Sequence, residues 1–151
     1  MEGGSLDSLT LVLDTNAVLD WLLFRDKGLA RVGAAIESGA ATAFTSRPCL
    51  EELRRVLGYP EFKLDEEKQA ALLEHYQEHV EVIDVTEDTD WAIVVPLCKD
   101  PDDQKFLALA SQERAVLVTK DKLLLQLARR VAKAGRFLIL RPDQLVERHL
   151  A

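Results

Sequence analysis

The chain has 151 residues, of which 48% are hydrophobic and 30% charged, and its formal net charge is −7. These values are typical of one globular domain, and no apolar run reaches the roughly 20 residues that span a bilayer. The acidic balance weakens a nucleic-acid partner without excluding it, because divalent cations bound at clustered acids would offset the local charge.

The two cysteines, Cys49 and Cys98, are too few for a disulfide scaffold or a cysteine zinc site. We expect both to be buried thiols, and we expect a reducing, cytoplasmic compartment. Residues 1–8 contain no Lys or Arg, unlike a secretory signal, and are predicted to form a flexible tail. Residues 9–151 are predicted to form a single domain.

In the first part of the domain, short apolar runs alternate with amphipathic ones. The predicted elements are a strand over 9–13, helices over 17–24 and 29–38, a strand over 41–45, and a helix that Ser46 caps and that runs to Leu57. Asp14 or Thr15 is available to cap the first helix, and Gly39 and Gly58 are placed to end the second and third.

The same alternation continues to the end of the chain. We expect a helix over 65–78, an edge strand from Val80 toward Val85, an ambiguous segment over 86–95 and a helix that begins at Asp102 or Asp103. A strand over 115–118, a helix from Asp121 through Lys133, a strand over 137–140 and a short helix over 142–149 are expected to follow. This pattern predicts an α/β fold of three layers, with a parallel sheet of about five strands covered by helices on both faces.

Three acids stand where a predicted strand ends or a predicted helix begins. Asp14 follows the first strand, Asp103 opens a helix in the segment Asp100-Pro101-Asp102-Asp103, and Asp121 follows the strand over 115–118. Ligands of open α/β sheets bind beyond the carboxyl ends of the strands, so these acids are candidates for one site. Asp is also a common helix cap, and this structural role is about equally favoured for each acid taken alone.

A fourth acid is expected from the segment Leu50-Glu51-Glu52-Leu53. At about 100° per residue, Glu52 borders the apolar stripe of its helix, whereas Glu51 points nearly opposite to it. Glu52 is therefore the better candidate for a site, and the alternative is that both are solvated partners of neighbouring arginines.

Crowded carboxylates repel one another, and a hard divalent cation with oxygen ligands removes that penalty. Because no His or Cys lies in these segments, Mg²⁺ or Mn²⁺ fits better than Zn²⁺. A metal held in this way can activate water and polarise a phosphodiester, which favours hydrolysis of nucleic acid.

Four segments in order resemble the motifs of the PIN domain family, in particular its toxin components related to VapC-type ribonucleases. They are Leu13-Asp14-Thr15-Asn16, the segment Ser46 to Leu57, the segment Cys98 to Ala110, and Leu117 to Leu124. The resemblance covers nearly the whole chain, from about Leu9 to Leu150. The acid of the second motif precedes a Leu, which again selects Glu52, and the spacing of the third selects Asp103.

The resemblance implies a metal-dependent nuclease with RNA as its usual substrate, an antitoxin protein as a partner, and homodimerisation. Asp14, Asp103 and Asp121 would hold the metal, with Glu52 completing its ligands or orienting water, and Asp100 as a further candidate ligand. Thr15, Asn16 and Thr119 would donate and accept hydrogen bonds around these ligands.

Cationic side chains flank the acidic segments and could contact phosphates. These are Arg47, Arg54, Arg55, Lys99, Lys105, Lys120 and Lys122. For any one of them a solvated surface position is the simpler interpretation.

Two other functions compete with the nuclease. One is a nucleic-acid or antitoxin-binding module without significant turnover, and the other is a receiver-like phosphoacceptor domain, which also gathers acids around Mg²⁺. His75 and His79 are four residues apart, a spacing that suits metal ligands. With no third ligand near them in the sequence, we expect them to be surface residues.

Overall fold

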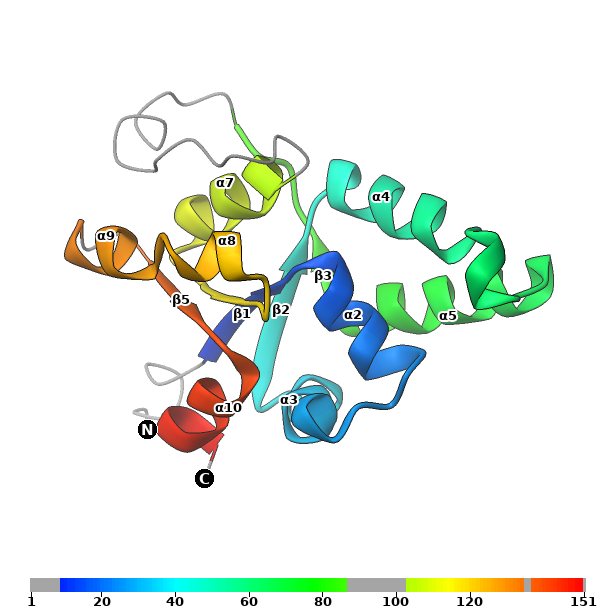
Figure 1. The fold of residues 1–151 in the computed structure, drawn as a ribbon, viewed down its shortest axis with the longest axis horizontal. Helices are drawn as coiled ribbons and strands as arrows, with labels where there is room; N and C mark the ends of the chain where they lie inside the picture. Colours follow the sequence, from blue (N-terminus) through cyan, green and yellow to red (C-terminus); the bar gives the residue numbers. More distant parts are fainter. Residues whose placement is uncertain (1–8, 87–102, 135–136, 151) are drawn as a thin grey trace.

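A computed structural model describes residues 9–86, 103–134 and 137–150, and its centre is a parallel sheet. The strands are β1 (Leu9–Leu13), β2 (Ala41–Thr45), β3 (Val80–Val82), β4 (Val116–Val118) and β5 (Leu138–Leu140). Their order is β3-β2-β1-β4-β5, and every neighbouring pair is parallel (Figure 1). The predicted α/β fold is confirmed, and β3 is an edge strand as expected.

The order of the strands reverses between β1 and β4. The first three strands proceed outward from β1 on one side, and the chain then crosses to place β4 on the other side. Leu13 lies beside Val118, so the two strands end at the same level. Crevices at such reversals are the usual ligand sites of open α/β sheets.

Alternate residues of each strand enter two separate hydrophobic cores, one on each face of the sheet. Leu11, Leu13 and Val118 belong to the first core, whereas Val12 and Leu117 belong to the second. This alternation is the two-residue period of a strand buried on both faces.

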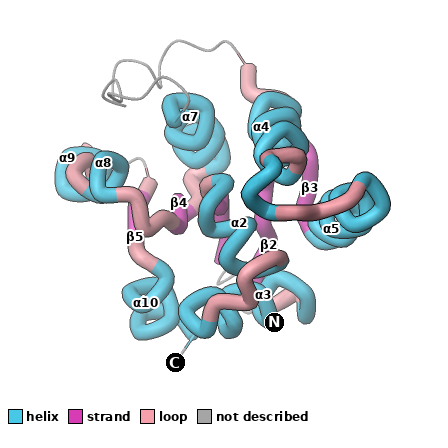
Figure 2. The backbone as a smooth tube through the Cα atoms, turned by 45° about the vertical axis from the view of Figure 1, so that its right-hand side comes forward, coloured by secondary structure: helices cyan, strands magenta, loops and turns pink. Residues whose placement is uncertain are grey.

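Helices cover both cores. The first is covered by α2 (Thr15–Leu22), α3 (Lys27–Ser38), α4 (Arg47–Leu57), α5 (Glu66–His79) and α10 (Pro142–Leu145). The second is covered by α7 (Gln104–Glu113), α8 (Lys122–Leu125) and α9 (Ala128–Lys133). Figure 2 shows helices around the sheet, with α9 and α5 on opposite sides of the molecule.

Local signals set most helix ends. Asp14 and Asp65 accept hydrogen bonds from Ala17 N–H and Lys68 N–H at the starts of α2 and α5. Gly39 ends α3 with φ +85°, a left-handed conformation that glycine adopts without strain. Ser46 does precede α4, but the expected capping bond is wrong, because its hydroxyl donates to Cys49 Sγ at 3.2 Å. Cys49 is buried, as predicted.

Two predicted helices are divided. The helix expected from Asp121 to Lys133 is two short helices, and Leu127 N–H bonds to Leu124 O, three residues back, at the joint. Leu124 belongs to the second core, and Leu125 and Leu127 pack against it. The expected terminal helix is α10 followed by a π-helical segment, Val146–Leu150.

A one-turn 3₁₀ helix, η1 (Pro60–Phe62), joins α4 to the segment before α5. The predicted tail 1–8, most of the ambiguous segment 86–95, and Cys98 lie outside the described residues. Among the helices of residues 9–86, 103–134 and 137–150, none is long and apolar enough to cross a membrane.

Candidate active site

A pocket of about 270 Å³ lies at the carboxyl ends of the central strands. Asp14, Glu52, Asp103 and Asp121 all line it. These four acids come from four separate segments of the chain, and they are the four that the sequence selects. The structure therefore brings the predicted acids together in one place.

Asp14 directly follows β1 and is 5% exposed. Its Oδ1 accepts the N–H of Ala17 at 2.9 Å, and its Oδ2 accepts the hydroxyl of Thr119. Burial raises the pKa of Asp14 to about 6, and the nearby charges of Asp121 and Asp20 act in the same direction. The two hydrogen bonds lower the pKa but do not offset burial.

Thr119, fully buried after β4, connects two of the acids. Its hydroxyl oxygen donates to Asp14 and accepts the N–H of Asp121 at 2.9 Å. Asp121 caps α8, where its Oδ1 accepts the N–H of Leu123 at 2.8 Å. One threonine thus sets the position of Asp121 relative to Asp14.

Glu52 projects from α4 into the pocket, and its carboxylate is held on both oxygens. Oε1 lies 2.5 Å from Lys105 Nζ, and Oε2 accepts the hydroxyl of Thr15. Its side chain is 12% exposed, whereas Glu51 belongs to the exposed residues of the same helix. The helical phase that favoured Glu52 in the sequence agrees with this placement.

Asp103 lies immediately before α7 and lines the pocket without making a capping hydrogen bond. Asn16 also lines it and is exposed. Asp100, the further candidate ligand, lies outside the described residues.

One side of the pocket is formed by η1 and its flanking residue, which sequence reasoning missed. Tyr59, Glu61 and Phe62 line the pocket, and the rings of Tyr59 and Phe62 stack with centroids 6.3 Å apart. Phe24, 55% exposed, meets Phe62 edge to face. Proline at position 60 disfavours a continued helix, but nothing in the sequence indicates which residues this break brings to the acids.

Several of the predicted phosphate contacts have other partners or positions. Lys120 pairs with Asp26 at 2.7 Å and with Asp20 at 3.1 Å. Arg54 lines a different pocket, formed by α4 and α5. The remaining cations are Arg47, Arg55 and Lys122, which are exposed, and Lys99, which lies outside the described residues. Lys105 does reach an acid of the pocket, since it pairs with Glu52.

The donor set suits a hard divalent cation. Carboxylates and the hydroxyl of Thr15 line the pocket, with no His or Cys among its lining residues. Oxygen ligands of this kind favour Mg²⁺ or Mn²⁺ over Zn²⁺. Burial, which raises the pKa of the Asp14 carboxyl to about 6, is a further sign, since a bound cation would stabilise the ionised form.

The fold and the pocket together define an α/β protein with a carboxylate site at its central strand reversal. The family model of the PIN domain matches residues 10–123, and the chain therefore belongs to the PIN domain family. No protein with a curated description matches the sequence.

Three solved structures share the fold. VapBC2 from Rickettsia felis, in a structure with a DNA fragment from its promoter, matches with a TM-score of 0.63 and 15% sequence identity, over 88% of this chain and 98% of the VapBC2 chain. PAE2754 from Pyrobaculum aerophilum matches with a TM-score of 0.58 and 20% identity, over 95% of this chain and 96% of the PAE2754 chain. FitAB bound to the IR36 DNA fragment matches with a TM-score of 0.53 and 18% identity, over 87% of this chain and 94% of the FitAB chain.

The receiver-like alternative does not fit the topology. Receiver domains have the strand order 2-1-3-4-5, whereas this sheet has 3-2-1-4-5. The four acids also come from four segments, without the pair of acids that a receiver places after its first strand.

Proposed function

We propose that this protein is a metal-dependent ribonuclease that hydrolyses RNA phosphodiester bonds as the toxin of a toxin–antitoxin pair. The observation that carries the proposal is the convergence of Asp14, Glu52, Asp103 and Asp121 on one pocket. Membership of the PIN domain family supports it, because nuclease activity is the common activity of that family.

Asp14, Asp103 and Asp121 would hold Mg²⁺ or Mn²⁺, with Glu52 and Asp100 as additional ligands. When bound, the metal would lower the pKa of a coordinated water and stabilise charge on the phosphodiester. The chain's own part is to keep the oxygen donors in position. Thr119 does this for Asp14 and Asp121, and Thr15 does it for Glu52.

Glu52 would orient the attacking water. Its contact with Lys105 would hold the carboxylate in position, and a carboxylate can accept a proton from water. Lys105 also brings a positive charge to a pocket of acids, where it would attract the phosphate of the substrate. The stacked rings of Tyr59 and Phe62 would take an unpaired base of single-stranded RNA.

The partners are also part of the proposal. Two of the solved relatives, VapBC2 and FitAB, carry a bound DNA fragment. The fold that this chain shares with them supports our proposal that its partner is an antitoxin protein. We also propose that two copies of this chain form a homodimer. We expect it to act in the cytoplasm.

The test is cleavage of a mixed single-stranded RNA pool by the purified full-length protein with Mg²⁺, with Mn²⁺ and with chelator. Cleavage should need the metal and be abolished in Asp14→Asn. Glu52→Gln should slow it by about 100-fold or more, while the neighbouring control Glu51→Gln should have no effect.

Equal cleavage by Glu52→Gln and Glu51→Gln would contradict the role of Glu52. Metal binding without cleavage of any RNA would favour a binding module without turnover. If neither metal binding nor cleavage is measured, the pocket is not a metal site.

A further inference from the structure

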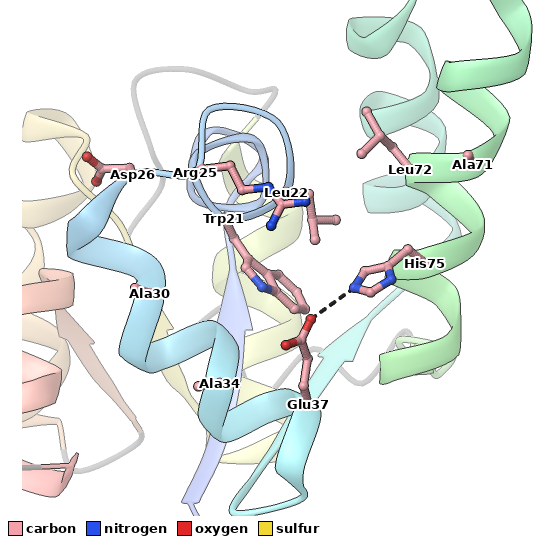
Figure 3. A pocket seen from close by; sticks show the side chains of 10 residues that line it. All are labelled: Trp21, Leu22, Arg25, Asp26, Ala30, Ala34, Glu37, Ala71, Leu72 and His75. Atoms are coloured by element: carbon pink, nitrogen blue, oxygen red, sulfur yellow. Dashed lines mark hydrogen bonds and ion pairs between the residues drawn. The ribbon is translucent and has the colours of Figure 1, made fainter.

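A second group of potential metal ligands lies away from the acidic pocket, between α3 and α5. Glu37 is near the end of α3, and His75 and His79 lie near the end of α5. Glu37 and His75 line a pocket of about 410 Å³, and neither lines the pocket of the four acids. Figure 3 shows Glu37 and His75 meeting beside Trp21.

The three side chains are close enough to share one ion. One potential ligand atom from each residue lies within 4.8 Å of the others. His75 Nε2 and Glu37 Oε2 are 2.9 Å apart and share a hydrogen bond, and a bound ion would take the place of the proton between them. His75 and His79 share one face of α5, and their rings are 4.5 Å apart between centroids.

The hydrogen bonding of His79 leaves its Nε2 able to bind a metal. His79 Nδ1 lies 2.9 Å from the carbonyl oxygen of His75, and a carbonyl only accepts, so Nδ1 carries the proton. In the neutral ring Nε2 then has an available lone pair. A backbone carbonyl on the other ring nitrogen is a common way to orient a metal-binding histidine.

We propose that Glu37, His75 and His79 form a binding site for a divalent transition-metal ion, with Zn²⁺ as its representative. Two imidazoles and one carboxylate favour such ions over Mg²⁺, which prefers an all-oxygen set. All three residues are accessible to solvent, so water completes the coordination. The ion would tie α3 to α5 by a link independent of the proposed nuclease site.

Trp21 gives this site a local reporter, because its ring is 6.3 Å from the ring of His75. Trp91 is the other tryptophan of the chain, and Trp91→Phe makes the emission specific to Trp21. We would titrate this full-length, untagged protein with Ni²⁺, a quenching ion of the same class, and then add Zn²⁺. The expected result is saturable quenching that Zn²⁺ reverses.

Variants separate this site from other histidines and from the acids. His75→Gln and His79→Gln should each weaken Ni²⁺ binding by tenfold or more, about 1.4 kcal/mol. His149→Gln removes the third histidine of the chain and should bind as the parent does. Asp14→Asn should also bind normally, so the outcome is independent of the nuclease proposal.

A second measurement does not depend on the folding of the histidine variants. In the Asp14→Asn protein, in which the acidic pocket has lost a ligand, Zn²⁺ should raise the thermal midpoint, and Mg²⁺ at the same concentration should not. The proposal is overturned if quenching is absent or unsaturable, or if it is unchanged in both His75→Gln and His79→Gln. It is also overturned if Zn²⁺ leaves the thermal midpoint of the Asp14→Asn protein unchanged.

Discussion

Asp14 combines a structural and a chemical role that have opposite effects on stability. It caps α2 through one oxygen, yet it is buried beside Asp121 and retains its proton up to a pKa of about 6. In the metal-free protein, ionisation of this group near neutral pH therefore costs free energy. A bound cation would offset this cost, so a stable pocket is expected to need its metal.

The raised pKa of Asp14 predicts how the stability of the metal-free protein depends on pH. The pKa of Asp14 is raised from 3.8 to about 6, so the folded state binds its proton more tightly than the unfolded state does. Stability of the metal-free protein should fall as the pH rises from about 4 to about 6, by about 2–3 kcal/mol from this group, and then level off. Urea unfolding at several pH values in chelator measures this.

Asn also caps helices well, so Asp14→Asn should remove that pH-dependent loss and raise the metal-free stability at pH 7 by about 1–2 kcal/mol. A less stable Asp14→Asn protein at pH 7 would show that the charge of Asp14 is compensated in the metal-free fold.

Lys105 and Glu52 form a partly buried ion pair, with side chains 20% and 12% exposed. Removing the cation leaves Glu52 with a charge that the pocket compensates poorly. We predict that Lys105→Gln lowers the free energy of unfolding by about 1–3 kcal/mol and that the loss is smaller when Glu52→Gln is also present. A double-mutant cycle in urea measures the coupling, and additive losses would contradict a direct interaction.

At the scale of elements, the Trp21 side chain of α2 packs directly on the backbone of α3 at Gly33. A Cβ at this position would overlap Nε1 and Cδ1 of Trp21, and Gly33 is buried. Glycine in the middle of a helix costs about 1 kcal/mol relative to alanine, so the close packing explains why it is found there.

We therefore predict that Gly33→Ala destabilises the protein by about 1–3 kcal/mol, despite its better helix propensity. The matched control is Gly28→Ala in the same helix, where the nearest atom to a Cβ is Asp26 Oδ2, the end of a flexible side chain, at 3.0 Å. Thermal unfolding compares the two variants. Equal midpoints would show that Trp21 can move aside at no cost.

The segment around η1 supplies the aromatic side of the acidic pocket. Tyr59 is 39% exposed and stacks on Phe62, so its ring is available to a base while contributing little to the core. We predict that Tyr59→Ala raises the KM for RNA by about tenfold with little change in Tm, since base stacking is worth about 1–3 kcal/mol. Steady-state cleavage with a single-stranded RNA checks this, and an unchanged KM would remove Tyr59 from the substrate contacts.

At the scale of the whole molecule, the net charge of −7 opposes binding of RNA. The four acids of the pocket are the part of that charge nearest to the proposed substrate. A bound cation would therefore permit RNA binding as well as hydrolysis.

This leads to a prediction about metal removal. The Kd for a 2′-O-methylated, uncleaved RNA should be about tenfold or more weaker in chelator than in Mg²⁺, and salt should weaken the Mg²⁺-supported binding. Fluorescence anisotropy at constant ionic strength measures both. The same Kd with and without metal would mean that RNA binds away from the acidic pocket.

Local patterns predicted most elements of this fold. Four of the strands lie within a residue or two of their expected positions, and β3 is the short edge strand expected near Val80. Asp14, Asp65 and Gly39 act locally, so their roles at helix ends could be predicted. The division of the helix over 121–133 could not, because no glycine or proline marks the joint between Leu125 and Ala128.

The sequence by itself determined the α/β class and the four candidate acids, because strand period, helix phase and motif order are properties of neighbouring residues. Only the tertiary structure decided which distant groups meet. It placed Tyr59 beside the acids, paired Lys120 with Asp20 and Asp26, and brought Glu37 to His75 and His79. These contacts join residues far apart in the chain, and they depend on how the helices pack against the sheet.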